Sequence, residues 1–343
     1  MNTVSHRLPE RRVRRLPWFV SLLLAIFLLL STQAAAATKR SPCAHPPRTP
    51  FTYHWPVKPF DRQHPIRGGF GDPRTVNLEH PFGWTGPLEI GAHSFHNGVD
   101  IVAGPGTPVY PVVSGRVVVA KEDEIVVRTH DDRSFQYYHL RSAVHRGQLV
   151  VVERTVLGWI QASYGHVHLA EIDGTVVHNP LDPGHLEPYR DRTTPKATGL
   201  YVDDGPQPFP IEGTWLRPQD QLAVAAVDLP TMALPGPWRG LPQTPALVEW
   251  RLFRNGVHGR WTIAADFRKT QPPRRDFWRV YGPGTYQNSP VFSHHLYLGT
   301  QGLYLFRIGG HPNHLSPGLY QLQVRVAGVC GNHSTITWPL EVG

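Results

Sequence analysis

A histidine and an aspartate lie four positions apart in the stretch FHNGVDI, residues 95–101. His96 and Asp100 share a face whether the stretch is a strand or a helix, and Gly98 with its β-branched neighbours favours a strand or a turn. An imidazole and a carboxylate are both zinc ligands, but the same spacing also suits two surface residues of a turn. The stretch alone leaves both interpretations open.

A second pair of candidate ligands occurs in GHVHLAEI, residues 165–172. If this run is a strand, His166 and His168 lie on one face, because side chains at positions i and i+2 point the same way. The alternative is two solvent-facing histidines on a half-exposed strand. With His96 and Asp100 the pair makes four candidate groups. A catalytic zinc has three protein ligands, so one histidine would remain for catalysis.

Short apolar runs that alternate with turn residues surround these histidines. Their β-branched and aromatic side chains predict strands, and none of the runs shows the 3.6-residue apolar period of a helix. The runs are PVYPVVSGRVVVA (residues 108–120), EIVVRTH (124–130), SFQYYHL (134–140), QLVVVE, TVLGWI and HVHLAEI. We therefore expect an all-β domain over residues 66–185.

Residues 186–199 are polar and contain prolines, which predicts a linker. In residues 200–343 apolar and polar residues alternate again, which predicts a second all-β domain, an immunoglobulin-like β-sandwich. The Cys…Trp…Cys framework of antibody domains is absent, so this prediction concerns the architecture alone. The runs are QLAVAAVDL, ALVEWRLFRNGV with its Asn255-Gly256 turn, WTIAADF, LYQLQVRVAG and STITWPLEV.

The N-terminus has the order of an export signal: a basic segment, the apolar run WFVSLLLAIFLLL and the small residues of STQAAAA. We expect residues 1–37 to be cleaved, because the apolar run is short for a span of about 20 residues; an uncleaved anchor is the alternative. Cleavage removes five arginines and one glutamate and lowers the formal net charge from +8 to +4. The mature protein is then expected in the periplasm, the cell envelope or the medium, with membrane contact only through the signal.

Nucleic acid is not an expected partner. After residue 40 the chain has no run of lysine and arginine with interleaved aromatic residues. Mild positive charge is instead compatible with an anionic polymer of the cell envelope.

The segment at residues 38–65 is rich in proline and basic groups, which predicts an extended lead-in rather than packed structure. It contains Cys43, and Cys330 is the only other cysteine of the chain. Two cysteines in an oxidising compartment predict one disulfide. Lipidation of Cys43 is disfavoured, because the residues RSP before it are not the small and aliphatic ones of a lipobox.

Four motifs follow one another in the order found in one enzyme family. The stretch HNGVD (residues 96–100) is followed by GTPVYPVVSGRV, then YYHL, then HVHL. In this combination the chain resembles the lysostaphin-type (LytM-like) zinc endopeptidases, which cut peptidoglycan cross-bridges. The resemblance covers about residues 66–182, roughly a third of the chain.

The resemblance implies a zinc ion held by His96, Asp100 and His168, with His139 and His166 as catalytic histidines, in a β-fold with a narrow groove over the metal. The chemistry of this set agrees, because zinc with two neutral imidazoles and one carboxylate stays positively charged, acidifies water and polarises a scissile carbonyl. His166 can accept a proton from the water, and His139 can hydrogen-bond the oxyanion or assist proton transfer. Which histidine performs which step is left open.

Some positions depart from the family pattern. A second glycine turn that is common after the one near Gly147 is replaced by VVERTV, and Tyr164 lies in the approach to the His-x-His motif. Ala170 occupies a position that is often glutamate, with Glu171 one residue later. These positions line the groove rim in the family, so they bear on substrate preference more than on catalysis.

Alternatives remain for both the site and the function. His93, three residues before His96, is a rival ligand. A non-catalytic relative that binds peptidoglycan or activates another cell-wall hydrolase is the main alternative to an enzyme, although the complete set of ligands and catalytic histidines argues against it. A lipoyl- or biotinyl-like carrier is disfavoured, because Lys121 in KEDE lacks the Met-Lys-Met setting.

The sequence therefore predicts a secreted zinc endopeptidase that hydrolyses peptide cross-links of peptidoglycan. Bulky Tyr164 and the turn VVERTV favour direct links between stem peptides over a polyglycine bridge. Stem peptides carry side chains and carboxylates that aromatic walls and mild positive charge can contact, whereas a glycine bridge offers neither.

Overall fold

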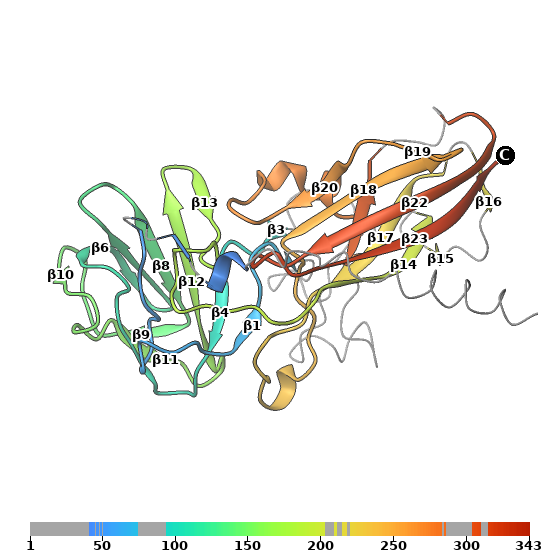
Figure 1. The fold of residues 1–343 in the computed structure, drawn as a ribbon. Helices are drawn as coiled ribbons and strands as arrows, with labels where there is room; N and C mark the ends of the chain where they lie inside the picture. The colour runs from blue at the N-terminus through green and yellow to red at the C-terminus, as the bar shows by residue number, and fades with distance from the viewer. Residues whose placement is uncertain are drawn as a thin grey trace, which may run out of the picture. The chain divides into compact units, whose positions relative to one another are not determined.

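The computed structural model consists almost entirely of strands and turns (Figure 1), as the sequence predicts. Residues Ser41–Gly343 form one compact unit. No helix in the described part of the chain is long and apolar enough to cross a membrane. The predicted export signal, residues 1–37, lies outside the described residues, which are 41–44, 46–47, 49, 51–74, 94–202, 209–210, 215–217, 220–282, 285, 304–309 and 315–343.

The first β region carries the predicted histidine motifs and is built from an antiparallel sheet of eight strands. In its strand β8, Phe135 and Tyr137 are buried while the residues between them are partly exposed, which is the two-residue period expected of a strand with one face on a core. The order in the sheet is β1 (Ile66–Gly68), β4 (Val99–Val102), β12 (His166–Asp173), β8 (Ser134–Tyr138), β7 (Glu124–Arg128), β6 (Gly115–Lys121) and β10 (Leu149–Val150), with β13 (Val176–His178) paired to β12.

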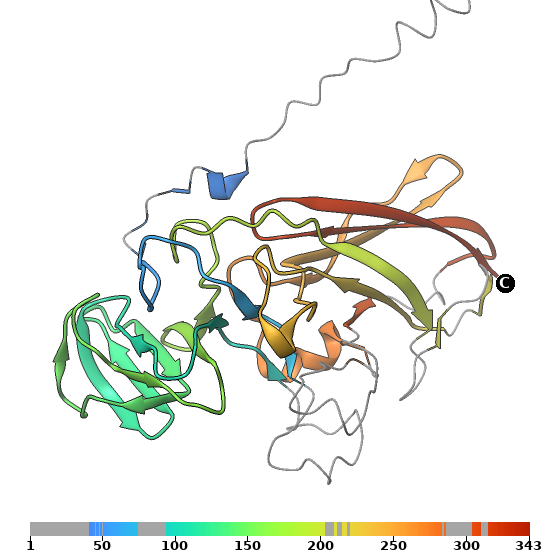
Figure 2. The same ribbon diagram turned by 90° about the horizontal axis from the view of Figure 1, so that it is seen from below.

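Two smaller sheets complete this region (Figures 1 and 2). They are β5 (Pro108–Val109), β11 (Gly158–Ile160) and β9 (Leu140–Ser142) in one sheet, and β2 (Pro73–Arg74) with β3 (Ser94–Phe95) in the other. The runs predicted as strands therefore all contain strands of the structure.

The lead-in differs from its prediction. Tyr53, Trp55 and Val57 are each at most 3% exposed and belong to the hydrophobic core. The Tyr53 hydroxyl donates to Glu171 Oε2 of β12 over 2.8 Å. Proline content suggested an unpacked segment, but its three large apolar side chains bury enough surface to fasten it to the first sheet.

The second β region contains two sheets. Both contribute buried side chains to the core, which is compatible with the predicted sandwich. One sheet has the order β15 (Phe209–Pro210), β14 (Lys196–Val202), β17 (Leu222–Val227) and β21 (Leu305–Ile308); the other has β16 (Trp215–Leu216), β23 (His333–Val342), β22 (Gly318–Ala327), β18 (Leu247–Arg254) and β19 (Val257–His258), with β20 (Thr262–Asp266) paired to β18.

Local features of this region follow from the sequence. Asn255 and Gly256 both have positive φ, 49° and 77°, as the tight turn between β18 and β19 requires. Strand β14 begins at Lys196, within the interval predicted as a linker. The described helices are single turns: η1 (Pro42–Ala44), η2 (Gly236–Trp238), η3 (Arg274–Asp276) and α2 (Phe277–Val280).

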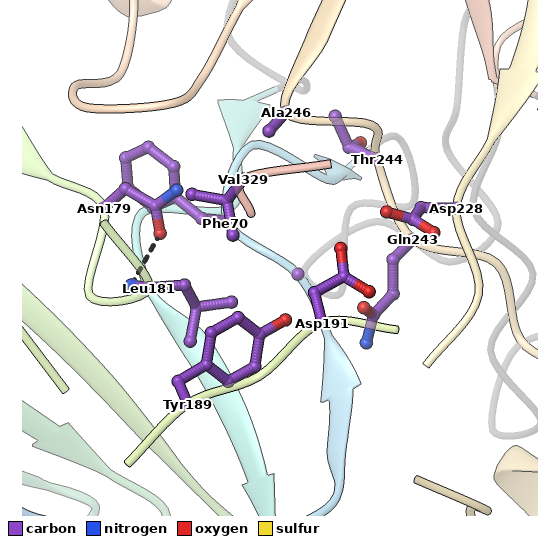
Figure 3. A pocket seen from close by; sticks show the side chains of 11 residues that line it. Phe70, Asn179, Leu181, Tyr189, Asp191, Asp228, Gln243, Thr244, Ala246 and Val329 are labelled. Carbon is purple, nitrogen blue, oxygen red and sulfur yellow. Dashed lines mark hydrogen bonds between the residues drawn. The ribbon is translucent and has the colours of Figure 1, made fainter. Parts of the chain in front are cut away.

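Buried hydrogen bonds join the two β regions. The Tyr281 hydroxyl donates to Gly71 O over 2.8 Å, and Asn179 Nδ2 donates to Phe267 O over 2.9 Å. A cavity of about 30 Å³ lies beside this junction, with room for about one water, and Asp191 is among the residues that line it (Figure 3).

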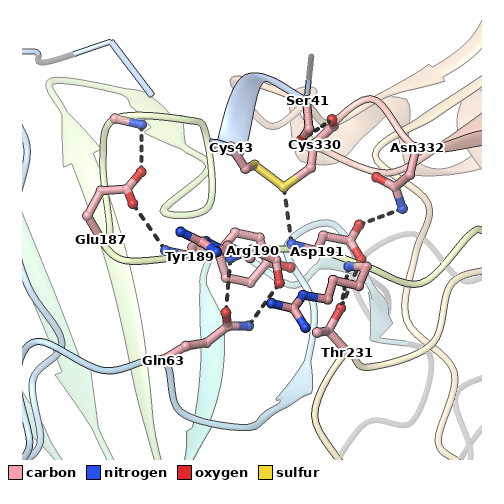
Figure 4. The surroundings of a disulfide bond; sticks show 12 residues. Ser41, Cys43, Gln63, Glu187, Tyr189, Arg190, Asp191, Thr231, Cys330 and Asn332 are labelled. Carbon is pink, nitrogen blue, oxygen red and sulfur yellow. Dashed lines mark hydrogen bonds between the residues drawn. A yellow bond between two sulfur atoms is a disulfide. The ribbon is translucent and has the colours of Figure 1, made fainter. Parts of the chain in front are cut away.

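The two cysteines expected to pair form a disulfide in the structure (Figure 4). Cys330 lies in the turn between β22 and β23, and Cys43 lies in the lead-in. The sulfur of Cys330 also accepts a hydrogen bond from the backbone N–H of Asp191, at 3.2 Å. The bridge therefore joins the start of the described chain to the last hairpin of the second region.

Candidate metal centre

The register of β4 and β12 brings the two sequence motifs together. Asp100 on β4 is the direct cross-strand partner of His168 on β12. Their backbones approach so closely near Gly98 that a Cβ there would lie 2.2 Å from Leu169 O and 2.8 Å from the His168 ring. Only glycine fits, so Gly98 of the first motif is a packing requirement of the second.

His96 reaches the same place from the end of β3. Its backbone N–H donates to Asp72 O and its carbonyl accepts from Gly71 N–H, both at 2.8 Å. His96 Nδ1 donates to Gly69 O over 2.7 Å. Because a carbonyl can only accept, the proton is on Nδ1 and the lone pair is on Nε2.

Three donor atoms converge on one point. His96 Nε2 lies 2.8 Å from His168 Nδ1 and 3.1 Å from Asp100 Oδ1, and His168 Nδ1 lies 3.2 Å from the same Oδ1. All three residues are at most 5% exposed. Among the described residues, they are the one group of three whose geometry could hold a metal ion.

The two oxygens of Asp100 have different partners. Oδ2 accepts from Arg67 Nη2 and from Arg74 Nη2, each at 3.1 Å, whereas Oδ1 faces the histidines. The two guanidinium groups therefore orient the carboxylate and leave Oδ1 as the ligand atom. Neither arginine was among the residues that the sequence suggested, because a single arginine carries no motif.

His166, the other histidine of the His-x-His motif, is 2% exposed. Its Nδ1 donates to Tyr164 O over 2.9 Å, which leaves the lone pair on Nε2. Nε2 lies 3.7 Å from Asp100 Oδ1 and accepts from Arg67 Nη2 over 3.2 Å. Nε2 of His166 therefore lies beside the group of ligands.

His139 follows the end of β8 with a φ of 72°, which is unusual for a residue other than glycine. In a continuing strand its side chain would point to the opposite face from Tyr138, so this backbone conformation lets it lie beside the site. Its ring is 4.6 Å from that of His166 and is stacked on Tyr164 at 3.9 Å. Nδ1 is 3.3 Å from Asp123 Oδ1.

The electrostatics of the site favour neutral imidazoles and a charged carboxylate. Burial lowers the pKa of both His96 and His166 to about 3, with Arg74 adding to the effect at His96 and Arg67 at His166. Burial also lowers the pKa of His139. Burial alone would raise the pKa of Asp100, but His96 and Arg67 hold it well below its ordinary value.

The donor set fits zinc. Two imidazole nitrogens and one carboxylate oxygen are the ligands of a catalytic zinc site. Each nitrogen can bind the ion through its lone pair when it carries no proton. Three acceptor atoms so close together repel one another unless a cation or a proton lies among them. The residues His96, Asp100 and His168 would hold the ion, and His139 and His166 lie beside it.

Other predicted features fall elsewhere. The rival ligand His93 lies outside the described residues. Glu171 is buried on the opposite side of β12 and pairs with Arg133, so it takes no part in the site. Besides the two arginines, the sequence did not indicate Asp123, which adjoins His139. An acidic residue in a β-turn is too common to stand out.

Residues 94–180 match the model of peptidase family M23. No match was found among curated proteins. Among solved structures, the chain is similar to the catalytic domain of the antimicrobial peptidase lysostaphin from Staphylococcus simulans, with 25% identity over 30% of this chain and 76% of that one and a TM-score of 0.23.

A zinc-containing peptidase from Vibrio cholerae is 25% identical over 35% of this chain and 36% of its own, with a TM-score of 0.27. The catalytic domain of a mutant of the prophage-encoded M23 protein EnpA from Enterococcus faecalis is 23% identical over 25% of this chain and 76% of its own, with a TM-score of 0.23. TM-scores this low carry no argument about function. The family match alone confirms the resemblance seen in the motifs.

Proposed function

We propose, from the match of residues 94–180 to peptidase family M23, that this protein is an exported zinc-dependent endopeptidase that hydrolyses peptide cross-links of peptidoglycan. The observation that supports the proposal most is the convergence of His96 Nε2, Asp100 Oδ1 and His168 Nδ1, each within 3.2 Å of the other two. A bound zinc ion supplies a Lewis acid that polarises the scissile carbonyl and acidifies water.

The chain's own groups take the proton and hold the oxyanion. His166 accepts a proton at Nε2, because its Nδ1 proton is committed to Tyr164 O. Arg67 Nη2 donates to the same Nε2, so this hydrogen bond must open while Arg67 stays paired with Asp100 Oδ2. In its protonated form, which the Asp123 carboxylate beside Nδ1 stabilises, His139 donates a hydrogen bond from Nε2 to the developing oxyanion or passes the proton on.

The substrate we favour is a direct link between stem peptides. Tyr164 stacks on His139, so an aromatic ring forms part of the surface beside the catalytic histidines. A polyglycine bridge has no side chains for such a ring to contact, whereas stem peptides carry side chains and carboxylates. Export through the segment at residues 1–37 would place the protein with this polymer in the periplasm, the cell envelope or the medium.

Digestion of purified peptidoglycan by the mature protein, with the fragments weighed by mass spectrometry, tests the proposal. Directly cross-linked muropeptide dimers should yield monomers faster than pentaglycine yields fragments, and chelation of zinc should stop the reaction. Faster cleavage of pentaglycine contradicts the substrate preference. No cleavage of either favours the alternative, a non-catalytic relative that binds peptidoglycan or activates another hydrolase.

A further inference from the structure

A loop of the second β region reaches the catalytic histidines. Residues 229–242, which we call the Trp238 loop, connect β17 to β18 and contain the 3-10 turn η2, drawn in gold in Figures 1 and 2. The loop is closed at its base, where Asp228 N–H donates to Gln243 O over 2.8 Å and Gln243 N–H donates to Asp228 O over 2.9 Å.

The base of the loop is fastened to the first β region. Gln243 Nε2 donates to Ile66 O over 2.7 Å, and the backbone N–H of Thr244 donates to Asp72 Oδ1 over 2.8 Å. Within the loop Leu234 and Leu241 are buried. A loop with buried side chains and a hydrogen-bonded base holds a defined conformation, so the position of Trp238 is fixed by packing.

Trp238 packs over the turn before the His-x-His motif. A Cβ at Gly165 would lie 2.7 Å from Trp238 Cη2, and Gly165 also has a positive φ of 65°, so two constraints require glycine there. The indole lies 5.6 Å from the Arg67 guanidinium and 6.3 Å, edge to face, from the His166 ring. Trp238 therefore lies beside both members of the hydrogen bond between Arg67 and His166.

The two sides of the catalytic pair differ in access. The side chain of His166, next to Trp238, is 3% exposed, whereas that of His139 is 22% exposed. Trp238 and Tyr164 are both partly exposed. The pair is therefore more accessible on the side of His139 and Tyr164, and the indole of Trp238 lies on the side of His166.

We propose that Trp238 is a specificity-determining residue, the wall of the substrate cleft on the side of His166, so that the second β region takes part in choosing the peptide. The indole face packs against the apolar part of a stem peptide. This inference rests on the proposed function. It adds to that function which side of the cleft, and which residue on that side, selects the substrate.

The test compares Trp238→Ala and Trp238→Phe with the matched control Trp261→Ala in the mature protein. Trp261 also stacks with arginines, at 4.4 Å from Arg251 and 4.6 Å from Arg325, but belongs to the second β region alone. Trp238→Ala should raise KM for directly cross-linked muropeptide dimers about tenfold with kcat changed less than about twofold. Zinc content should stay at one per chain, Trp238→Phe should restore much of the KM, and Trp261→Ala should match wild type.

A binding measurement separates this inference from the proposed function. Titration of uncut dimers into zinc-loaded His139→Ala, with and without Trp238→Ala, should give a Kd about tenfold weaker in the double variant. If the wild-type protein binds the dimers but does not hydrolyse them, the proposed function is contradicted. The comparison of Kd values still decides the role of Trp238. An unchanged KM and Kd, or a faster kcat in Trp238→Ala, overturns the inference. Wild type that neither binds nor cleaves the dimers overturns both.

Discussion

Strand β12 carries two buried clusters of histidine, carboxylate and arginine, and they differ in how their polar atoms are matched. Around His168, two ring nitrogens and Asp100 Oδ1 face one another within 3.2 Å. Around Glu171, every contact pairs a donor with an acceptor: the Tyr53 hydroxyl and His185 Nδ1 each lie 2.8 Å from Oε2, and Arg133 Nη1 pairs with Oε1.

This difference separates a binding site from a structural cluster. Residue types alone would make both clusters equal candidates, since each contains histidine and a buried carboxylate. In the Glu171 cluster the charges neutralise one another and nothing further is required. In the His168 cluster three atoms that can all act as acceptors face one another, and a cation among them would relieve their repulsion. The matching of donors and acceptors, more than composition, identifies the site.

The largest effect should come from removing a ligand. His168→Ala or Asp100→Ala should lower the zinc content of the mature protein from one per chain to none and abolish hydrolysis, because two remaining ligands cannot complete the coordination. Metal analysis after dialysis measures the first effect and muropeptide digestion the second. His145→Ala, at an exposed histidine of the same β region, is the control and should behave as wild type.

The catalytic pair should respond differently from the ligands. His166→Ala and His139→Ala should keep zinc at one per chain and lose about 10² to 10⁴-fold in turnover, because each removes a group that moves or stabilises a proton rather than holds the ion. Metal analysis and steady-state rates on the same preparations check this. Metal loss here, with retention in the ligand variants, would reverse the assignment of roles.

Removing the carboxylate of the Glu171 cluster should lower stability and leave zinc binding unchanged. Glu171→Gln removes the carboxylate that neutralises the buried Arg133, so the free energy of unfolding should fall by about 3 kcal/mol with zinc content unchanged. Denaturant unfolding measures the change. Asp173→Asn, at the other partner of Arg133, is the matched control: its side chain is 54% exposed, and it should cost less than about 1 kcal/mol. Equal losses for both variants would refute the distinction.

The smallest expected effect concerns a carboxylate that faces another carboxylate. Burial and then neighbouring Asp191 raise the pKa of Asp228 to about 8. Between about pH 4 and pH 8 the folded protein keeps the Asp228 proton while the unfolded chain has lost it. The contribution of protonated Asp228 to the free energy of unfolding is therefore full below pH 4 and is lost as the pH rises through 8.

Asp228→Asn removes this titration. The free energy of unfolding of the variant minus that of wild type should grow by about 1 to 3 kcal/mol as the pH is raised from 5 to 8. Asp61→Asn, at an exposed aspartate, should follow wild type throughout. Urea unfolding at several pH values provides the measurement. A difference between Asp228→Asn and wild type that does not vary with pH would show that Asp228 does not titrate in this window.

Sequence patterns were sufficient for the local features of the fold. Runs of β-branched residues predicted β6, β7 and β8, and the Asn255-Gly256 pair predicted a turn with two positive φ values. Spacing placed His166 and His168 on one strand, and their grouping with His96 and Asp100 followed from the order of the motifs. These signals lie within a few residues of one another, where the period of a strand or turn governs them.

Features that depend on distant segments left no such signal. The burial of Tyr53 and Trp55 depends on partners more than 100 residues away, and a proline-rich composition masked it. The role of Arg67 depends on its pairing with Asp100, and the role of Trp238 depends on its contact with Gly165. One arginine or tryptophan has no period, so tertiary contacts alone reveal what it does.

The disulfide between Cys43 and Cys330 has a consequence for resistance to proteolysis. Its cysteines are 287 residues apart, so the first β region and the strands of the second region up to β22 lie inside a single covalent ring, and β23 follows it. One cut by a foreign protease at any exposed turn within the ring opens a peptide bond but releases no fragment, and the two pieces stay tethered at a high effective concentration. Two cuts are needed to lose a piece, which makes the bridge a safeguard against nicking.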